Sequence, residues 1–233
     1  MTEPTGWAII SDIDDVSLSS RSSGKTVLIM LQTIKVTQTP SPIGILKNTF
    51  CVEHPEPVAG MPEVYKHMHS FLQQPPWFYL SASPYNLYPF LRDFRNANYP
   101  QGTIILRDAS WQNLGGLVAS LSQGTQEYKA NRIEKIHAWL PNKKFICIGD
   151  STQSDPEAYG ECARKFPGWI GAIFIRKVTG IAEMNEHEKN SAERFEKAFQ
   201  GLDKSLWHVF TNPKEIADRV NLMVEPGQPD DNN

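Results

Sequence analysis

The chain contains little cysteine, no excess of positive charge and no long hydrophobic run. Its three cysteines are too few, and odd in number, for a disulfide framework, which favours a reducing, cytoplasmic location. The longest purely apolar run, Val27–Leu31, has five residues, whereas a transmembrane helix needs about 18–20. A net charge of -3 disfavours nucleic-acid binding, and the N-terminus lacks the features of a signal peptide. These absences leave a globular protein of ordinary composition.

Short apolar segments alternate with helical patterns along most of the chain. Strands are expected at residues 7–11, 77–81, 103–107, 144–148, 172–175 and 206–210, and helices at 62–74, 84–96, 126–140, 155–166, 186–200 and 213–223. This alternation predicts an α/β fold with a three-layer, doubly wound and mostly parallel sheet. Ligands of such sheets bind at the carboxyl ends of the strands. Residues 1–224 are expected to form one domain and residues 225–233 a disordered tail.

Two carboxylates follow the first apolar segment. Asp12 and Asp14 are two residues apart just after a strand, so their charges would repel at the edge of the sheet unless a cation lies between them. A solvated acidic loop is the simpler interpretation of such a cluster. An EF-hand calcium loop fits poorly, because it needs Gly where Ser17 stands and a helix in place of the strand.

A second acidic segment follows the fourth predicted strand. Gly149 would let the backbone turn sharply there, so that Asp150 points into the site. Asp155 stands where a helix N-cap is expected, with Pro156 at the first helical position, and this structural role alone would explain it. Gly-Asp-Ser also fits the nucleophile turn of a serine esterase, but none of the six histidines has an Asp three residues before it to hold it.

Ser81 and Lys129 complete a set of groups in sequence order. Ser81 ends the second predicted strand and Lys129 lies in the helix before the fourth; alone, the first is a common capping residue and the second a common surface residue. Together with Asp-x-Asp before them and Gly-Asp after them, they supply the groups that phosphoryl transfer needs. These are a carboxylate nucleophile, an acid/base carboxylate, a hydroxyl and an ammonium for the phosphoryl oxygens, and acids for Mg²⁺.

This order and spacing resemble the haloacid dehalogenase-like phosphatase superfamily and, more narrowly, the catalytic domain of the actin-patch phosphatidate phosphatase family. The matching stretches are SDIDD (Ser11–Asp15), GILKNTF (Gly44–Phe50), AGMPEVY (Ala59–Tyr65), YLSASPYNLYPFLRDF (Tyr79–Phe94), GTIILRD (Gly102–Asp108), EYKANRIEKI through KFICIGDSTQSDPEAYGE (Glu127–Glu161) and PGWIGAIFIRKV (Pro167–Val178). The resemblance covers nearly the whole chain. It implies a haloacid dehalogenase-like, Rossmann-like fold with a minimal cap.

The resemblance also implies a role for each catalytic group. Asp12 would be the nucleophile that becomes aspartyl-phosphate, and Asp14 would protonate the leaving alkoxide and then activate water. Ser81 would hydrogen-bond the phosphoryl oxygens, and Lys129 would neutralise the phosphoryl group and Asp12. A dianionic phosphate monoester repels an anionic nucleophile, so these cations are needed on electrostatic grounds as well.

The cofactor implied by the resemblance is Mg²⁺. Asp12, Asp14 and Asp150 would form its ligand shell, with Asp155 as a supporting acid at the same site. Carboxylate oxygens are the ligands that Mg²⁺ prefers.

The same resemblance implies the substrate and the surroundings of the protein. The substrate would be phosphatidate at a membrane surface, hydrolysed to diacylglycerol and phosphate by a peripherally bound enzyme. Location in the cytoplasm or at cortical actin patches, with endocytic actin-patch proteins as partners, is expected on the same basis. Larger members of the family carry an additional N-terminal region, which this chain lacks.

The chain departs from the family pattern at one place. The pattern is Asp-x-Asp-x-Thr, but the fifth position here is Val16, and removing Val16–Gln32 restores the motif by joining Asp15 to Thr33. Since Val codons begin with GT and one Gln codon ends with AG, this Ser-rich block has the form of a retained in-frame intron. A true surface insertion is the rival interpretation. The interruption also leaves open a non-catalytic pseudophosphatase or scaffold, and a phosphatase for another phosphoester.

Overall fold

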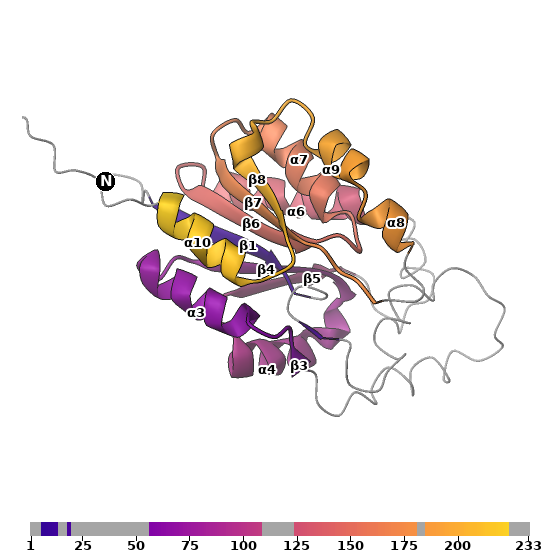
Figure 1. Ribbon diagram of the computed structural model, residues 1–233. Helices are drawn as coiled ribbons and strands as arrows, with labels where there is room; N and C mark the ends of the chain where they lie inside the picture. The colour runs from indigo at the N-terminus through magenta and orange to yellow at the C-terminus, as the bar shows by residue number, and fades with distance from the viewer. Residues whose placement is uncertain (1–5, 14–17, 20–55, 109–123, 181–184, 224–233) are drawn as a thin grey trace, which may run out of the picture.

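A computed structural model describes residues 6–13, 18–19, 56–108, 124–180 and 185–223 (Figure 1). Its centre is a six-stranded sheet in the order β5-β4-β1-β6-β7-β8. The strands are β1 (Trp7–Asp12), β4 (Trp77–Pro84), β5 (Thr103–Arg107), β6 (Lys144–Asp150), β7 (Ile170–Arg176) and β8 (Trp207–Phe210). Every neighbouring pair is parallel, so the predicted α/β sheet is confirmed and is parallel throughout.

Helices cover both faces of the sheet. They are α3 (Met61–Phe71), α4 (Tyr88–Asn98), α6 (Thr125–Trp139), α7 (Asp155–Lys165), α8 (Glu186–Lys189), α9 (Ala192–Ala198) and α10 (Lys214–Met223), with short 3-10 turns at Tyr85–Leu87 and Lys204–Leu206. In Figure 1, α6, α7 and α9 lie on one side of the sheet and α3, α4 and α10 on the other. This is the doubly wound, three-layer arrangement of a Rossmann-like haloacid dehalogenase fold.

Side chains point alternately to the two faces of the sheet along each strand, and this explains why there is a hydrophobic core on each face. In β1, Ala8 and Ile10 pack with residues of α6, α7 and α9, whereas Ile9 packs with residues of α3, α4 and α10. In β6, Cys147 faces the first layer and Ile146 the second. Successive side chains of a strand point to opposite faces, so a strand with helices on both sides must be apolar at every position. This is why these segments read as short continuous apolar runs in the sequence.

Three elements differ from the sequence-based expectation. The strand that begins at Trp77 runs on to Pro84, and one 3-10 turn separates it from α4, so that helix begins at Tyr88 rather than at residue 84. The single helix expected at 186–200 is divided into α8 and α9. The hydroxyl of Ser191 accepts a hydrogen bond from the backbone N–H of Arg194 and so begins α9 as a new helix.

The order of the strands fixes where a ligand can bind. The chain passes from β1 outward to β4 and β5, then returns to the other side of β1 with β6, β7 and β8. This reversal on the two sides of β1 is the switch point beside which α/β sheets bind ligands, at the carboxyl ends of the strands. We call this end of the sheet the carboxyl edge.

Several predictions fall outside the described residues. They concern Asp14, the tail at 225–233 and most of Val16–Gln32. Within that block the structure describes β2 (Leu18–Ser19), which pairs antiparallel with β3 (Glu56–Pro57). Among the described helices, none has the length and apolar character that crossing a membrane requires.

Candidate active site

Three neighbouring strands deliver polar side chains to the carboxyl edge. Asp12 is the last residue of β1, Ser81 lies near the end of β4, and Asp150 is the last residue of β6. The register places Asp12 opposite Leu80 on one side, next to Ser81, and Ser11 opposite Ile148 on the other. All three polar side chains are fully buried. The sheet therefore brings together residues that are far apart in the sequence.

Lys129 reaches this edge from α6. Its ammonium donates to Oδ1 of Asp12 at 2.8 Å and to Oδ1 of Asp155, and all three side chains are fully buried. Burial by itself lowers the pKa of Lys129, but the two carboxylates outweigh it and raise this pKa above its ordinary value. The lysine is therefore a fixed positive charge inside the acidic site.

Asp155, the first residue of α7, links Lys129 to the backbone of Asp150. Besides its contact with Lys129, it accepts a hydrogen bond from the backbone N–H of Asp150 through Oδ2, at 3.0 Å. Burial raises the pKa of Asp155, Lys129 lowers it, and the charges of Asp12 and Asp150 raise it again, so the net shift is upward. The prediction that Asp155 caps α7 was off by one residue, because Ser154 precedes the helix as its N-cap.

Gly149 has a different purpose from the one expected. Strand β6 continues through it to Asp150, so it does not turn the chain. A Cβ atom at this position would lie 2.5 Å from Cβ of Asp155 and 2.7 Å from its Oδ2. Glycine is required here because the side chain of Asp155 occupies the space that any other side chain would need.

The two carboxylate oxygens of Asp150 differ in their hydrogen bonding. Its Oδ1 accepts hydrogen bonds from the backbone N–H and the hydroxyl of Thr152, both at 2.6 Å. Its Oδ2 is buried and has no hydrogen-bond partner within the part of the chain that the structure describes. A buried, unsatisfied carboxylate oxygen is costly unless a cation or a donor meets it.

The acidic group, defined as Asp12, Asp150 and Asp155, fits a divalent cation. One carboxylate oxygen from each residue lies within 4.8 Å of the others. Within the described part of the chain, the only ammonium that contacts these three carboxylates is that of Lys129, which leaves an excess of buried negative charge. Hard oxygen ligands with an excess of negative charge are what Mg²⁺ binds.

The structure brings together four of the six predicted site residues. Asp12, Lys129, Asp150 and Asp155 form one cluster of contacts. Ser81 lies at the same edge, on the neighbouring strand, and its hydroxyl accepts a hydrogen bond from the backbone N–H of Ser83 at 2.9 Å.

Two residues of this region were not anticipated from the sequence. Thr152 fixes the carboxylate of Asp150, and Arg194 on α9 contacts the segment between Asp150 and Asp155. The contact of Thr152 carried a signal, because the side chain of an Asp commonly accepts a hydrogen bond from the backbone N–H two residues further on. Arg194 carried none, since it stands in a charged helix typical of a solvated surface.

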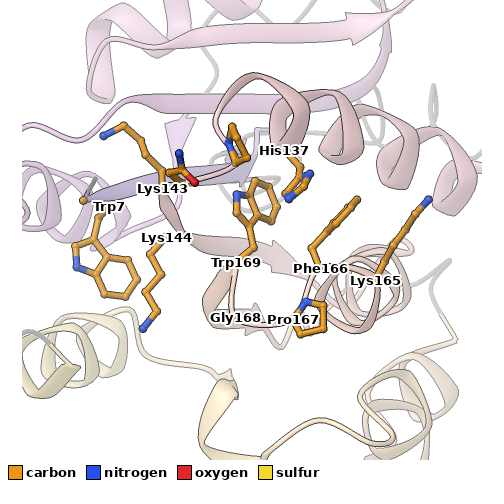
Figure 2. A pocket seen from close by; sticks show the side chains of 12 residues that line it. Trp7, His137, Lys143, Lys144, Lys165, Phe166, Pro167, Gly168 and Trp169 are labelled. Carbon is orange, nitrogen blue, oxygen red and sulfur yellow. The ribbon is translucent and has the colours of Figure 1, made fainter. Parts of the chain in front are cut away.

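A cavity of about 760 Å³ lies away from the acidic group. Its lining comes from the amino ends of β1, β6 and β7, so it opens at the opposite end of the sheet (Figure 2). Two of its lysines already have partners: Lys165 donates to Glu134 at 2.5 Å, and the ammonium of Lys144 lies 5.6 Å from the centre of the Trp7 ring. Its position separates this cavity from the chemistry of the carboxyl edge.

The chain belongs to the phosphatidate phosphatase APP1 catalytic-domain family. The profile described as "Phosphatidate phosphatase APP1, catalytic domain" matches residues 31–177, which is more than half of the chain. The matched range contains Ser81, Lys129, Asp150 and Asp155 and begins after Asp12.

Two curated relatives agree with this assignment. The chain is 33% identical over 175 residues to phosphatidate phosphatase APP1 of Saccharomyces cerevisiae, which covers 74% of this chain and 26% of that protein. It is 27% identical over 192 residues to the uncharacterized protein C29B5.04c of Schizosaccharomyces pombe, covering 80% of this chain and 28% of that protein. The chain thus spans about a quarter of the length of the curated relatives it matches.

Proposed function

We propose that the chain is a Mg²⁺-dependent phosphatidate phosphatase that works through an aspartyl-phosphate on Asp12. The observation that carries this proposal is the buried contact between Lys129 and two carboxylates, Asp12 and Asp155, at the carboxyl edge of a sheet from this family. Residues 1–224 would form the catalytic domain. Burying a lysine between carboxylates costs desolvation free energy on folding. A non-catalytic scaffold would have little need of such a group.

The proposed reaction has two steps. An oxygen of Asp12 attacks the phosphorus atom, the bond from phosphorus to the glycerol oxygen breaks, and a proton passes to the leaving alkoxide. Water then attacks the aspartyl-phosphate, loses a proton, and releases phosphate and the free carboxylate of Asp12. The family resemblance assigns both proton transfers to Asp14.

Lys129 and Ser81 would act on the phosphoryl group. The ammonium of Lys129 already lies 2.8 Å from Asp12 Oδ1, where it lowers the repulsion between that carboxylate and an incoming dianion. Ser81 lies on the adjacent strand, and its hydroxyl would donate to a phosphoryl oxygen. Both groups are fully buried, so they require no large solvent rearrangement during the reaction.

The acidic group would hold Mg²⁺ through Asp12 and Asp150, with Asp14 as a further ligand. Oδ2 of Asp150, which is buried and accepts no hydrogen bond from the described residues, supports this assignment. Both oxygens of Asp155 already accept hydrogen bonds, which favours a role in positioning Lys129 and the backbone of Asp150 over direct coordination. Mg²⁺ bound here would supply positive charge against the phosphoryl oxygens.

The lipid substrate is proposed from the relatives and from the surface beside Ser81. The printed name of the budding-yeast relative gives phosphatidate as its substrate. Tyr85 and Tyr88 follow the carboxyl end of β4. Their side chains are exposed, with 51% and 44% of the residue surface accessible. Tyrosines suit the boundary between lipid and water, because one end of the side chain is apolar and the other is polar. Peripheral membrane contact from the cytoplasm, and actin-patch proteins as partners, belong to the same proposal.

A non-catalytic protein is the second candidate, and the block Val16–Gln32 favours it. The block separates Asp14 from the Thr that normally follows in the motif, and a displacement of about 1 Å in a catalytic group can cost ~10²-fold in rate. The family match begins at residue 31, two residues before Thr33, where the family pattern is expected to resume. This supports the interpretation of the block as foreign to the family.

The deciding experiment is Mg²⁺-dependent phosphate release from phosphatidate in mixed micelles. Two forms are compared, the chain as given and the chain without Val16–Gln32, each with an Asp12→Asn control. Activity in both forms, abolished by the control, would make the block a tolerated insertion. Activity only in the shorter form would support the enzyme and identify the block as an intron. Folded but inactive protein in both forms would overturn the proposed function, and a soluble aryl phosphate would then test for another phosphoester.

A further inference from the structure

The segment 151–154 connects the two carboxylates of β6 and α7. It begins after Asp150 and ends before Asp155, so its conformation sets the distance between these residues. Thr152, inside the segment, holds Oδ1 of Asp150 through two hydrogen bonds. Any shift of the segment would therefore move the carboxylate proposed to bind the metal.

A single arginine from α9 holds this segment by its backbone. Nη1 of Arg194 donates to the carbonyl oxygen of Ser151 at 2.6 Å, and Nη2 donates to the carbonyl oxygen of Gln153 at 2.5 Å. These carbonyls flank Thr152 on both sides. The same arginine donates to the carbonyl oxygen of Lys189 at 2.8 Å and thereby ties α8 to the segment.

Arg194 is itself fixed in place. Its Nε and Nη2 donate to the two carboxylate oxygens of Glu157 on α7, at 2.7 and 2.9 Å. Helix α9 lies so close to α7 that a Cβ on Gly160 would come within 2.1 Å of the carbonyl oxygen of Ala198. The side chain of Arg194 is only 14% exposed. A planar guanidinium with five donors can make all these contacts at once, whereas a lysine ammonium cannot.

We propose that Arg194 is a positioning residue for the metal ligand Asp150. It acts through segment 151–154, whose two carbonyls it holds on either side of Thr152. The proposal rests on the proposed function, since it assigns Arg194 to the support of the same metal site. Removing a group that orients a metal ligand commonly lowers the affinity for the metal by about 10–100-fold.

The test is a titration of the full chain with Mg²⁺, followed by the rise in thermal unfolding temperature. Arg194→Gln is expected to raise the Mg²⁺ concentration at half-effect about ten-fold, and Arg194→Lys by less. The matched control is Arg164→Gln. Arg164 stands at the same helix pair and donates to the carbonyl oxygens of Ala198 and Gln200, but it does not touch segment 151–154.

The outcomes separate this proposal from the proposed function. A wild-type Mg²⁺ midpoint in Arg194→Gln, or the same midpoint shift in Arg164→Gln, would overturn the positioning role, even if the chain hydrolyses phosphatidate. A wild-type chain that shows no Mg²⁺-dependent rise would overturn it as well. A chain that binds Mg²⁺ with the expected midpoints but hydrolyses no phosphate ester would support Arg194 and reject the phosphatase.

Discussion

Among the described residues, Lys129 is the one cation that contacts the acidic group, and it contacts two of its three carboxylates. Its contacts with Asp12 and Asp155 are made without exposure to water, so each charge depends on the others. Removing one partner of a buried ion pair is far more costly than removing one from the surface, because the remaining charge has neither solvent nor a counter-ion.

Replacing Lys129 by Met should therefore destabilise the metal-free protein strongly. We expect a loss of about 3–5 kcal/mol in the free energy of unfolding, because the three buried carboxylates would lose the ammonium that contacts two of them. Mg²⁺ should recover part of this loss, and phosphatase activity should disappear. Urea unfolding with and without Mg²⁺ measures the effect. Lys165→Met, at an exposed pair with Glu134, is the control and should change little; equal losses in the two variants would contradict the prediction.

Gly149→Ala tests the close approach of β6 and Asp155. The added methyl group would lie 2.5 Å from Cβ of Asp155, so Asp155 must move and its contacts with Lys129 and Asp150 must lengthen. We expect a loss in kcat of about 10²-fold, as for other displacements near 1 Å. Gly124→Ala is the matched control, because a Cβ there meets none of the described residues within 4 Å. Similar kinetics in both variants would show that Asp155 does not need its present position.

At the scale of elements, hydrogen bonds just before and at the start of helix α10 stabilise its N-terminus. The side chain of Asn212 accepts from the backbone N–H of Lys214, and Glu215 accepts from the backbone N–H groups of Asn212 and Thr211. The contact from Glu215 back to Asn212 is one half of a capping box, whereas the side chain of Asn212 bonds two residues ahead and not three. The helix then buries Ile216 and Val220 against the sheet.

The pH dependence of this cap follows from Glu215. Burial raises the pKa of Glu215, but the hydrogen bonds from Asn212, His208 and Thr211 lower it more, so the folded-state pKa lies below the ordinary value near 4.5. The stabilisation is then present above the unfolded-state pKa and is lost as the pH falls through the folded-state pKa. Glu215→Ala should cost about 1 kcal/mol of unfolding free energy at pH 7. The difference from wild type should shrink in acid; a constant difference across pH would contradict this account.

The elements and most of the site were predictable because their signals are local. Strands β1 and β6 are short apolar runs that end in Asp12 and Asp150, and Ser81 follows the apolar part of β4; parallel strands carry these residues to one edge. Arg194 was not predictable, because its partners are carbonyl groups 41 and 43 residues away that have no side-chain signature. The requirement for Gly149 was missed for the same reason. It depends on where Asp155 lies in space, which spacing along the chain does not give.

At the scale of the whole molecule, the two ends of the sheet differ in chemistry. The acidic group and the exposed Tyr85 and Tyr88 lie toward the carboxyl edge, whereas the lysine- and tryptophan-lined cavity of Figure 2 opens at the amino ends of the strands. Under the proposed function, a membrane that presents phosphatidate would face the carboxyl edge, so that the lipid headgroup reaches Asp12.

Changing Tyr85 and Tyr88 together to Ser should therefore slow hydrolysis at a lipid surface selectively. We expect about a ten-fold lower rate on phosphatidate in vesicles, since lost aromatic contact with lipid costs on the order of 1–2 kcal/mol. Hydrolysis of a soluble aryl phosphate should stay unchanged. Trp139→Ser is the control, because Trp139 is exposed but ends α6 near the other end of the sheet. Equal slowing on both substrates would show that the tyrosines support the site and not the membrane contact.

The contact between Lys129 and Asp12 joins residues 117 positions apart. Asp12 ends β1, but β6, the strand on one flank of β1, and α6, the helix that carries Lys129, follow more than a hundred residues later. During synthesis, β1 can pair with β4 before β6 and Lys129 have been made, but it must wait for these two partners. Parallel pairing between such distant segments is slow to form. The contact between Asp12 and Lys129 should thus form late in folding, and a chain that ends before α6 would lack it.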